Sequence, residues 1–193
     1  MDHPTLSKHK RYTYADYQAW PDEERWELID GVAYNMTPAP NTRHQKISSA
    51  LHGIIWSFLR GKTCQVFPAP FDVRLPKANQ SEKESDTVVQ PDLSVFCDPK
   101  KIDEKGAIGA PDWVIEVLSP STLKKDVGVK TLLYQAHGVA EYWLVDPEAE
   151  TISVLRFDPE LKRYGLGQEF TREHSVAPAQ FPGLSIALEE VFG

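Results

Sequence analysis

The segment that most constrains the fold is an apolar run with one acidic residue inside it. Trp113–Leu118 reads Trp-Val-Ile-Glu-Val-Leu, and a second short apolar run, Leu93–Phe96, directly follows Asp92. Nearly continuous apolar runs of this length are typical of central strands that are covered on both faces. The chain is therefore expected to build a sheet with a packed layer on each side, and to place Glu116 inside it.

A long amphipathic helix is the clearest second element. Apolar residues recur on one helical face from about residue 43 to residue 60. Asn41 or Thr42 can cap the start of this helix, and Gly61 can close it. The pattern predicts a helix that packs its apolar face against the sheet.

A second helix is predicted over about residues 125–137, with Gly138 as its terminator. Its inward residues are expected to be Val129, Leu132, Leu133 and Ala136. Two short helices are expected, one at Tyr14–Trp20 capped by Thr13 and a terminal one with Leu188 and Phe192. A hairpin is expected in which Asp30-Gly31 joins Trp26–Leu28 to Val32–Met36. Further strands are expected at Phe71–Leu75, Tyr142–Val145 and Thr151–Phe157. This order of helices and strands predicts an α/β (α+β mixed) fold, in which helices flank a mixed central β-sheet. We expect one domain over residues 13–193, preceded by a flexible tail over residues 1–12.

Composition excludes several classes of protein. With 193 residues and a net charge of −7, the chain suits one domain and lacks the basic surface that coats nucleic acid or anionic membranes. We find no signal-peptide pattern near the N-terminus and no apolar run that could span a bilayer, so we expect a cytoplasmic protein. Cys64 and Cys97 are then expected to be two reduced thiols.

Carboxylates inside predicted strands are the first sign of chemistry, because Asp and Glu are almost never buried without a partner. Asp92 could simply close a turn at a strand edge, and Glu116 could simply pair with a buried Arg or Lys. Together on neighbouring strands, they could instead bind one hard cation such as Mg²⁺. A nearby lysine would orient or help deprotonate a water molecule and offset phosphate charge. The candidate lysines are Lys124, Lys125 and Lys130.

The pair Pro91-Asp92 and Glu116-Val117-Leu118 resembles the PD-(D/E)xK motif of the restriction-endonuclease-like superfamily. Within that superfamily the chain is similar to the Uma family of proposed restriction endonucleases over about residues 12–158. Further matching stretches are Trp26–Gly31, Gln90–Leu93, Glu116–Thr122, Asp126–Lys130 with Tyr134 and Gly138-Val139, and Glu141–Pro147. The resemblance implies a restriction-endonuclease-like core and an endodeoxyribonuclease that uses Mg²⁺, with Mn²⁺ as an alternative.

One position departs from the superfamily pattern. Leu118 stands where the motif has lysine, and the resemblance implies that this lysine has migrated to the following helix as Lys130. Glu27 matches an early family glutamate that could supply a metal or supporting oxygen, or it could be a surface hairpin residue. His44 matches a family histidine that could contact phosphate or a metal-bound water, or it could be an exposed residue of the first helical turn.

Three functions are open from the sequence. The leading hypothesis is a DNA endonuclease with Asp92, Glu116 and Lys130 at its site. The alternatives are an inactive nuclease fold that binds DNA or a protein, and a structural oligomer that associates through Trp20, Trp26 and Trp56.

The expected partner is DNA, most simply double-stranded, and a homodimer would supply the two sites that duplex cutting needs. Residues 1–80 carry 10 basic and 8 acidic side chains, whereas residues 81–193 carry 11 and 20. DNA is therefore expected to approach over the basic residues of the first part, Arg43, Lys46, Arg60 and Lys62.

Overall fold

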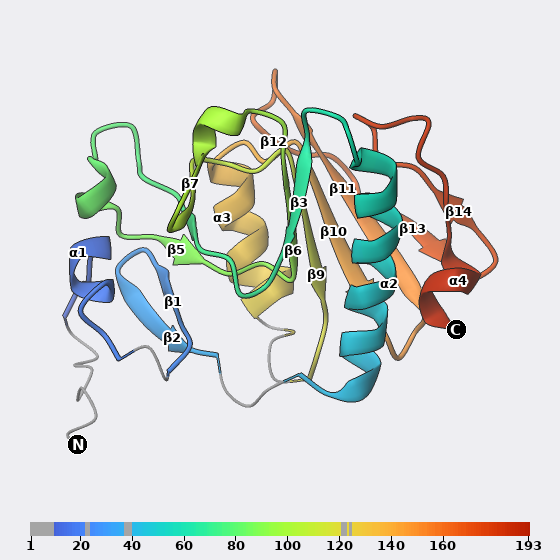
Figure 1. Ribbon diagram of the computed structural model, residues 1–193, viewed down its shortest axis with the longest axis horizontal. Coiled ribbons are helices and arrows are strands. Elements are labelled where there is room, and N and C mark those ends of the chain that lie inside the picture. Colours follow the sequence, from blue (N-terminus) through green and yellow to red (C-terminus); the bar gives the residue numbers. More distant parts are fainter. Residues whose placement is uncertain (1–9, 22–23, 37–39, 121–122, 124) are drawn as a thin grey trace.

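A mixed sheet forms the centre of the structure (Figure 1). The computed structural model describes residues 10–21, 24–36, 40–120, 123 and 125–193. The strands of this central sheet run in the order β12-β11-β10-β9-β6-β3, and β13 also pairs with β11. Their bounds are β3 Gln65–Pro68, β6 Leu93–Phe96, β9 Trp113–Val117, β10 Glu141–Asp146, β11 Thr151–Asp158, β12 Arg163–Tyr164 and β13 Gln168–Thr171. The pair β9–β10 is parallel and the other pairs of this sheet are antiparallel. The predicted mixed sheet is thereby confirmed.

A second sheet of short strands lies beside the first, in the order β2-β1-β5-β4-β8-β7. Its strands are β1 Trp26–Ile29, β2 Val32–Asn35, β4 Val73–Arg74, β5 Val88–Val89, β7 Ile102–Asp103 and β8 Gly106–Ile108. Asp30 and Gly31 join β1 to β2 with φ angles of 48° and 76°, as a two-residue hairpin turn requires. The predicted hairpin is confirmed. A separate two-stranded ladder pairs β14 (Ser175–Val176) with β15 (Ile186–Ala187).

The long predicted helix is present as α2, Thr42–Leu59. The Asn41 side chain caps it by accepting a hydrogen bond from the backbone N–H of His44 at 2.9 Å, and Gly61 follows it with a φ of 78°. The remaining helices are α1 (Tyr14–Tyr17), α3 (Thr131–Ala136) and α4 (Leu188–Phe192), with short 3₁₀ turns at Glu82–Glu84 and Pro99–Lys101. A π-helical segment, Lys125–Lys130, leads into α3.

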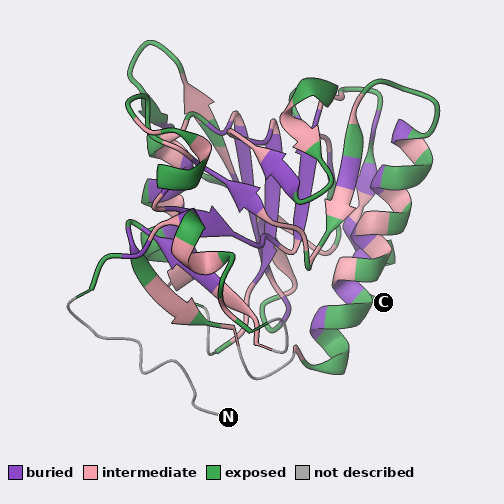
Figure 2. Cartoon of the chain, turned by 60° about the vertical axis from the view of Figure 1, so that its left-hand side comes forward, coloured by how far each residue is buried: buried purple, intermediate pink, exposed green. Residues whose placement is uncertain are grey.

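Two apolar clusters lie on opposite faces of the central sheet. One cluster joins α2, α4 and the chain around β14 and β15 to the face that carries Trp113, Ile115 and Val117 of β9. The other joins α3 and the second sheet to the opposite face, which carries Val114 of β9. Figure 2 shows the buried residues running along the central strands and along the inner side of α2. Both faces of β9 are therefore covered, as its apolar sequence predicts.

The predicted inward face of the second helix is wrong. Leu132 is 66% exposed and Val129 is 39% exposed, and Ala136 is also exposed. The inward positions include Leu133, as predicted, but otherwise carry Asp126, Lys130 and Tyr134. The π-helical segment changes the angular spacing of the residues, and buried ionic partners take the place of apolar contacts on this face.

The N-terminal tail and several short strands also differ from the sequence analysis. Residues 1–9 of the predicted tail lie outside the described residues, whereas Tyr12 is buried in a small apolar cluster. The strand predicted at Phe71–Leu75 is reduced to the two residues of β4. The sequence analysis did not anticipate the short strands β3, β5, β7, β8 and β12–β15, because each holds only a few residues with no clear alternation.

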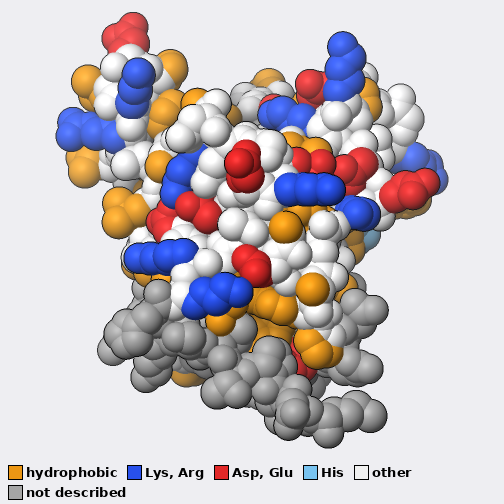
Figure 3. Space-filling model, turned by 90° about the vertical axis from the view of Figure 1, so that its left-hand side faces the viewer, with side chains coloured by type: hydrophobic (Ala, Val, Ile, Leu, Met, Phe, Trp, Pro, Cys, Tyr) orange, Lys and Arg blue, Asp and Glu red, His pale blue; other side chains and the backbone are white. Residues whose placement is uncertain are grey.

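Acidic and basic side chains are interspersed on the surface seen in Figure 3. Lys77 forms ion pairs with both Asp30 and Asp86, at 2.9 and 2.8 Å. No helix within the described ranges is long and apolar enough to cross a membrane.

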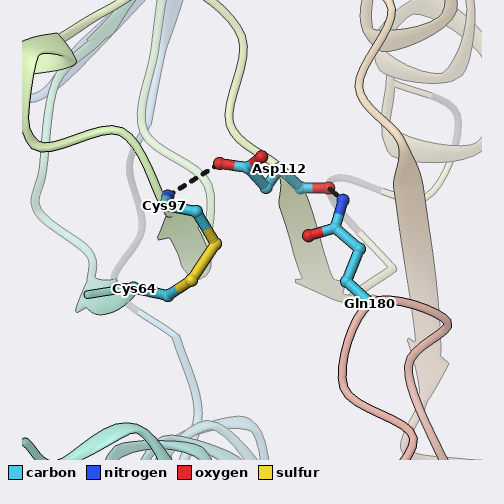
Figure 4. The surroundings of a disulfide bond; sticks show 4 residues. All are labelled: Cys64, Cys97, Asp112 and Gln180. Carbon is cyan, nitrogen blue, oxygen red and sulfur yellow. Dashed lines mark hydrogen bonds between the residues drawn. A yellow bond between two sulfur atoms is a disulfide. The ribbon is translucent and has the colours of Figure 1, made fainter. Parts of the chain in front are cut away.

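The expectation of two reduced thiols is wrong, since Cys64 and Cys97 form a disulfide (Figure 4). Cys64 directly precedes β3 and Cys97 directly follows β6, and these strands pair with Gln65 opposite Phe96. The two cysteines are therefore neighbours across the ladder, although 33 positions separate them in the sequence. The backbone N–H of Cys97 also donates to Asp112 at 2.8 Å.

Candidate active site

A cleft of about 710 Å³ opens at the end of the central sheet where β6 begins and β9 ends. One wall is the polar side of the first turns of α2, and the opposite wall includes the segment that leads into α3. Four of the five predicted site residues line it, namely His44, Asp92, Glu116 and Lys130. The fifth, Glu27, is fully buried and contacts Lys130. The fold thus gathers all five from separate parts of the chain.

Asp92 and Glu116 face each other across two antiparallel strands. Leu93 of β6 pairs with Ile115 of β9, so the preceding residue, Asp92, lies next to Glu116. The backbone N–H of Asp92 lies 3.4 Å from Glu116 Oε2, and the N–H of Val117 donates to Asp92 Oδ2 at 2.8 Å. The strand pairing therefore holds both carboxylates together at the cleft.

Glu116 is the most perturbed of these carboxyl groups. Its side chain is buried, and its Oε1 accepts hydrogen bonds from Lys130 Nζ at 2.8 Å and from the Tyr134 hydroxyl at 2.9 Å. Burial raises the pKa of Glu116 to about 8, against the attraction of Lys130 and with the repulsion of Asp126, Asp92 and Glu27. Negative charge in this part of the cleft is therefore costly without a further cation.

Lys130 lies at the centre of the ionic cluster and does not face solvent. Its ammonium lies 2.8 Å from Glu27 Oε1, 2.8 Å from Glu116 Oε1 and 3.6 Å from Asp126 Oδ1. Burial lowers the pKa of Lys130, but these carboxylates together raise it well above its ordinary value. Lys130 is thus held as a cation and is a hydrogen-bond donor.

Glu27 is buried under the cleft rather than exposed on a surface hairpin. Its Oε2 accepts from Lys125 Nζ at 2.7 Å, and its Oε1 accepts from the backbone N–H of Gln90 at 3.0 Å, besides its contact with Lys130. Burial opposes its ionisation, yet the two lysines hold the pKa of Glu27 below its usual value. Glu27 therefore positions both lysines.

His44 is buried in the first turn of α2, where an exposed histidine was the alternative. Its Nε2 lies 3.1 Å from Asp92 Oδ2, and its Nδ1 lies 3.4 Å from the Ser48 hydroxyl. Burial lowers the pKa of His44, but the hydrogen bond and the charge of Asp92 raise it above its ordinary value. The imidazole therefore orients Asp92 and can carry a proton at the cleft.

Sequence reasoning did not anticipate the polar role of the helix face that carries Lys130. Asp126 and Tyr134 lie four residues before and after Lys130, and all three side chains are buried on the inner side of this helical segment. The Tyr134 hydroxyl donates a hydrogen bond to Glu116 Oε1. The four-residue spacing of Asp126, Lys130 and Tyr134 was the signal that could have found them. Lys124, another candidate lysine, lies outside the described residues.

Asp92 and Glu116 supply the oxygen atoms that could hold a hard cation, because both line the cleft and lie against each other. Within the described residues, no group of three or more His, Cys, Asp or Glu side chains is arranged to hold a metal ion. A cation here would therefore complete its coordination with backbone oxygens, water or substrate.

Comparisons with known proteins show the family and the fold of the chain. The chain is 32% identical over 143 residues to "Uncharacterized protein slr1290" of Synechocystis sp., which covers 72% of this chain and 70% of that protein. It superposes with a TM-score of 0.73 on a crystal structure from Anabaena variabilis described as "a putative nuclease belonging to DUF820". That match has 26% sequence identity and covers 94% of this chain and 97% of the other. The model of the family Uma2, described as "Putative restriction endonuclease", matches residues 14–189. The chain therefore belongs to the Uma2 family.

Proposed function

We propose that the protein is a metal-dependent DNA endonuclease that hydrolyses phosphodiester bonds. The observation that carries this proposal is the juxtaposition of Asp92 and Glu116 on paired strands, with Lys130 Nζ 2.8 Å from Glu116. All three side chains line one cleft. The family match and the structural likeness support a nuclease.

The carboxylate pair fits a hard divalent cation, Mg²⁺ or Mn²⁺, because both ions prefer oxygen ligands. Two carboxylates suit Mg²⁺ in particular, since it commonly retains several waters and binds substrate phosphate. A cation would also offset the burial and the carboxylate repulsion that together raise the pKa of Glu116. When bound, it supplies Lewis-acid polarisation of the phosphate and lowers the pKa of the attacking water.

Lys130 replaces the lysine that the PD-(D/E)xK pattern has at Leu118. Its ammonium reaches Glu116 from the helix that follows the strand. Because the surrounding carboxylates keep it protonated, Lys130 orients the attacking water and stabilises developing negative charge, and it is not a general base.

His44 and Glu27 support the three residues at the centre of the site in different ways. The His44 imidazole holds Asp92 in place and, with its raised pKa, can donate a proton to the leaving oxygen. Glu27 fixes Lys130 and Lys125, and its oxygens are already occupied by these partners. We assign Glu27 a positioning role rather than that of a metal ligand.

Cleavage of supercoiled plasmid DNA tests this function. The purified protein with Mg²⁺ is expected to nick the plasmid, and EDTA is expected to stop the reaction. Asp92→Ala and Glu116→Ala should each lower the rate at least about 100-fold, since loss of a group that stabilises transition-state charge has effects of this order. Glu160→Ala, at an exposed turn, is the matched control.

Two outcomes would contradict the proposal. Cleavage that survives both Asp92→Ala and Glu116→Ala would remove the site from these residues. Binding of DNA without cleavage under any divalent ion would favour the inactive, DNA-binding alternative.

We further propose double-stranded DNA as the substrate and a homodimer as the cutting unit, because a duplex presents two strands to be cut. Sedimentation equilibrium should then give twice the mass of the 21.8 kDa chain. A monomer that linearises DNA in one binding event would contradict the dimer.

A further inference from the structure

We propose that Arg25 binds a backbone phosphate of the DNA next to the one that reacts. This inference rests on the proposed function and adds to it a subsite that holds the substrate. Arg25 lines the same cleft as Asp92 and Lys130 but contacts neither of them.

The backbone places Arg25 beside the ionic cluster. Arg25 precedes β1, and the N–H of Met36 donates to its carbonyl at 2.9 Å, which extends the β1–β2 ladder by one rung. Arg25 and Glu27 are two residues apart in extended chain, so their side chains project to the same side. Arg25 therefore stands on the wall of the cleft while Glu27 lies under it.

A neutral amide holds the guanidinium in place. Arg25 Nε and Nη2 both donate to Gln90 Oε1, at 3.1 and 2.9 Å. The amide is itself fixed, because Gln90 Nε2 donates to Asp72 Oδ1 at 2.8 Å and to the Tyr17 hydroxyl at 3.3 Å. Asp72 thus orients the forked guanidinium of Arg25 through the amide of Gln90.

The charge of Arg25 is available to a ligand, unlike that of the neighbouring lysines. Lys130 and Lys125 form ion pairs with buried carboxylates. In the part of the chain that the structure describes, no carboxylate oxygen lies within 4.0 Å of the Arg25 guanidinium. Gln90 occupies two of the five N–H donors of Arg25, and a planar guanidinium with free donors is well suited to phosphate.

The bound phosphate would be a neighbour of the reacting one. The reacting phosphate belongs at Asp92, Glu116 and Lys130, where the carboxylates and the ammonium meet. Gln90, which holds Arg25, lies two residues before Asp92 in the short connection between β5 and β6. Arg25 therefore lines the same cleft and is held by a residue close in sequence to Asp92, so it would bind the DNA beside the reacting groups and take no part in the reaction itself.

Binding to a catalytically silent protein tests the subsite apart from cleavage. Asp92→Ala protein with Mg²⁺ is titrated with a fluorescein-labelled 20-base-pair DNA duplex at several salt concentrations, and anisotropy reports the affinity. Adding Arg25→Ala should weaken binding about tenfold and reduce the slope of log K against log salt by about 0.9, as expected for one lost phosphate contact. Arg25→Lys should keep the slope and lose part of the affinity, because lysine keeps the charge but not the fork.

The control is Arg163→Ala in the same background, which removes an equal charge at an exposed residue of β12 outside the cleft. Thermal unfolding should verify that each variant is folded. In Asp92-containing protein, Arg25→Ala should raise KM about tenfold and leave kcat within about threefold, as loss of uniform binding does.

An unchanged salt slope for Arg25→Ala, an equal loss for Arg163→Ala, or no DNA binding by the Asp92→Ala protein would each overturn the subsite. DNA binding that depends on Arg25, without cleavage by the wild-type protein, would instead overturn the proposed function and leave the subsite standing.

Discussion

The two faces of strand β9 differ sharply in chemistry although they belong to consecutive residues. Trp113, Ile115 and Val117 point toward α2 and lie in a fully apolar cluster. On the other face, Val114 lies in apolar surroundings, but Glu116 joins Lys130 in a buried ionic cluster at the cleft. One strand thus serves both the core and the candidate site.

The comparison shows that different interactions account for the burial of the two faces. Apolar burial stabilises the α2 face directly, by about 25 cal/mol for each Å² removed from water. A buried ion pair contributes little net stability, because desolvation offsets the attraction between its charges. Stability alone therefore does not explain the charged face, whereas the proposed function accounts for it.

Lys130→Met is the change expected to have the largest effect, because it disrupts the charged face. Methionine matches the length of lysine but leaves Glu116 and Glu27 without their shared cation. Unfolding free energy should fall by about 3–5 kcal/mol, the usual cost of a broken buried pair. Urea unfolding gives the stability, and plasmid cleavage should drop at least about 100-fold.

The double variant Lys130→Met/Glu116→Gln distinguishes stability from function. It also neutralises Glu116, one of the two buried carboxylates that Lys130→Met leaves without their shared cation. The double variant should therefore recover much of the lost stability without restoring cleavage. Recovery of cleavage by this double variant would contradict the role of both residues.

Ile115→Ala disrupts the apolar face next to the same site. Ile115 is 1% exposed, and its truncation should cost about 3 kcal/mol through lost transfer energy and a cavity. Cleavage by the folded fraction should remain within about threefold of the wild type, since no reacting group is changed. A loss of activity as large as that of Lys130→Met would show that the two faces are not separable.

Removal of the disulfide is a further test of the apolar face, because Cys64 packs against the apolar cluster that includes α2. The bond closes a loop with a sequence separation of 33 residues. Cys64→Ala/Cys97→Ala should therefore lower the unfolding free energy by about 2–4 kcal/mol, through the greater freedom of the unfolded chain. Urea unfolding with and without a reductant checks this, and the double variant should be insensitive to the reductant.

Tyr134→Phe is expected to have the smallest effect, and it sharpens the description of the charged face. It removes the hydrogen bond of 2.9 Å to Glu116 and leaves the ring in place. Stability should fall by about 1 kcal/mol, the typical contribution of one such bond. Cleavage should fall less than about tenfold, and a complete loss would assign Tyr134 to the reacting groups.

Local pattern determined the elements that carry their own signal. The periodicity of α2 with its Asn41 cap, the Asp30-Gly31 hairpin, and the apolar run of β9 are all present where the sequence indicates them. The same run also marked Glu116 as unusual, because a charge in a buried strand requires a partner.

Only the tertiary structure decided which partners meet. The pairing of Lys130 with Glu27, the burial of His44 against Asp92, the Cys64–Cys97 bond and the Arg25–Gln90 fork all join residues far apart in the sequence. The face of the second helix was mispredicted for the same reason, since its buried charges are stabilised by strands that its own sequence does not contain. Periodicity reports the contacts of a segment with its immediate turn or strand, whereas a buried charge depends on the ions that the fold brings to it.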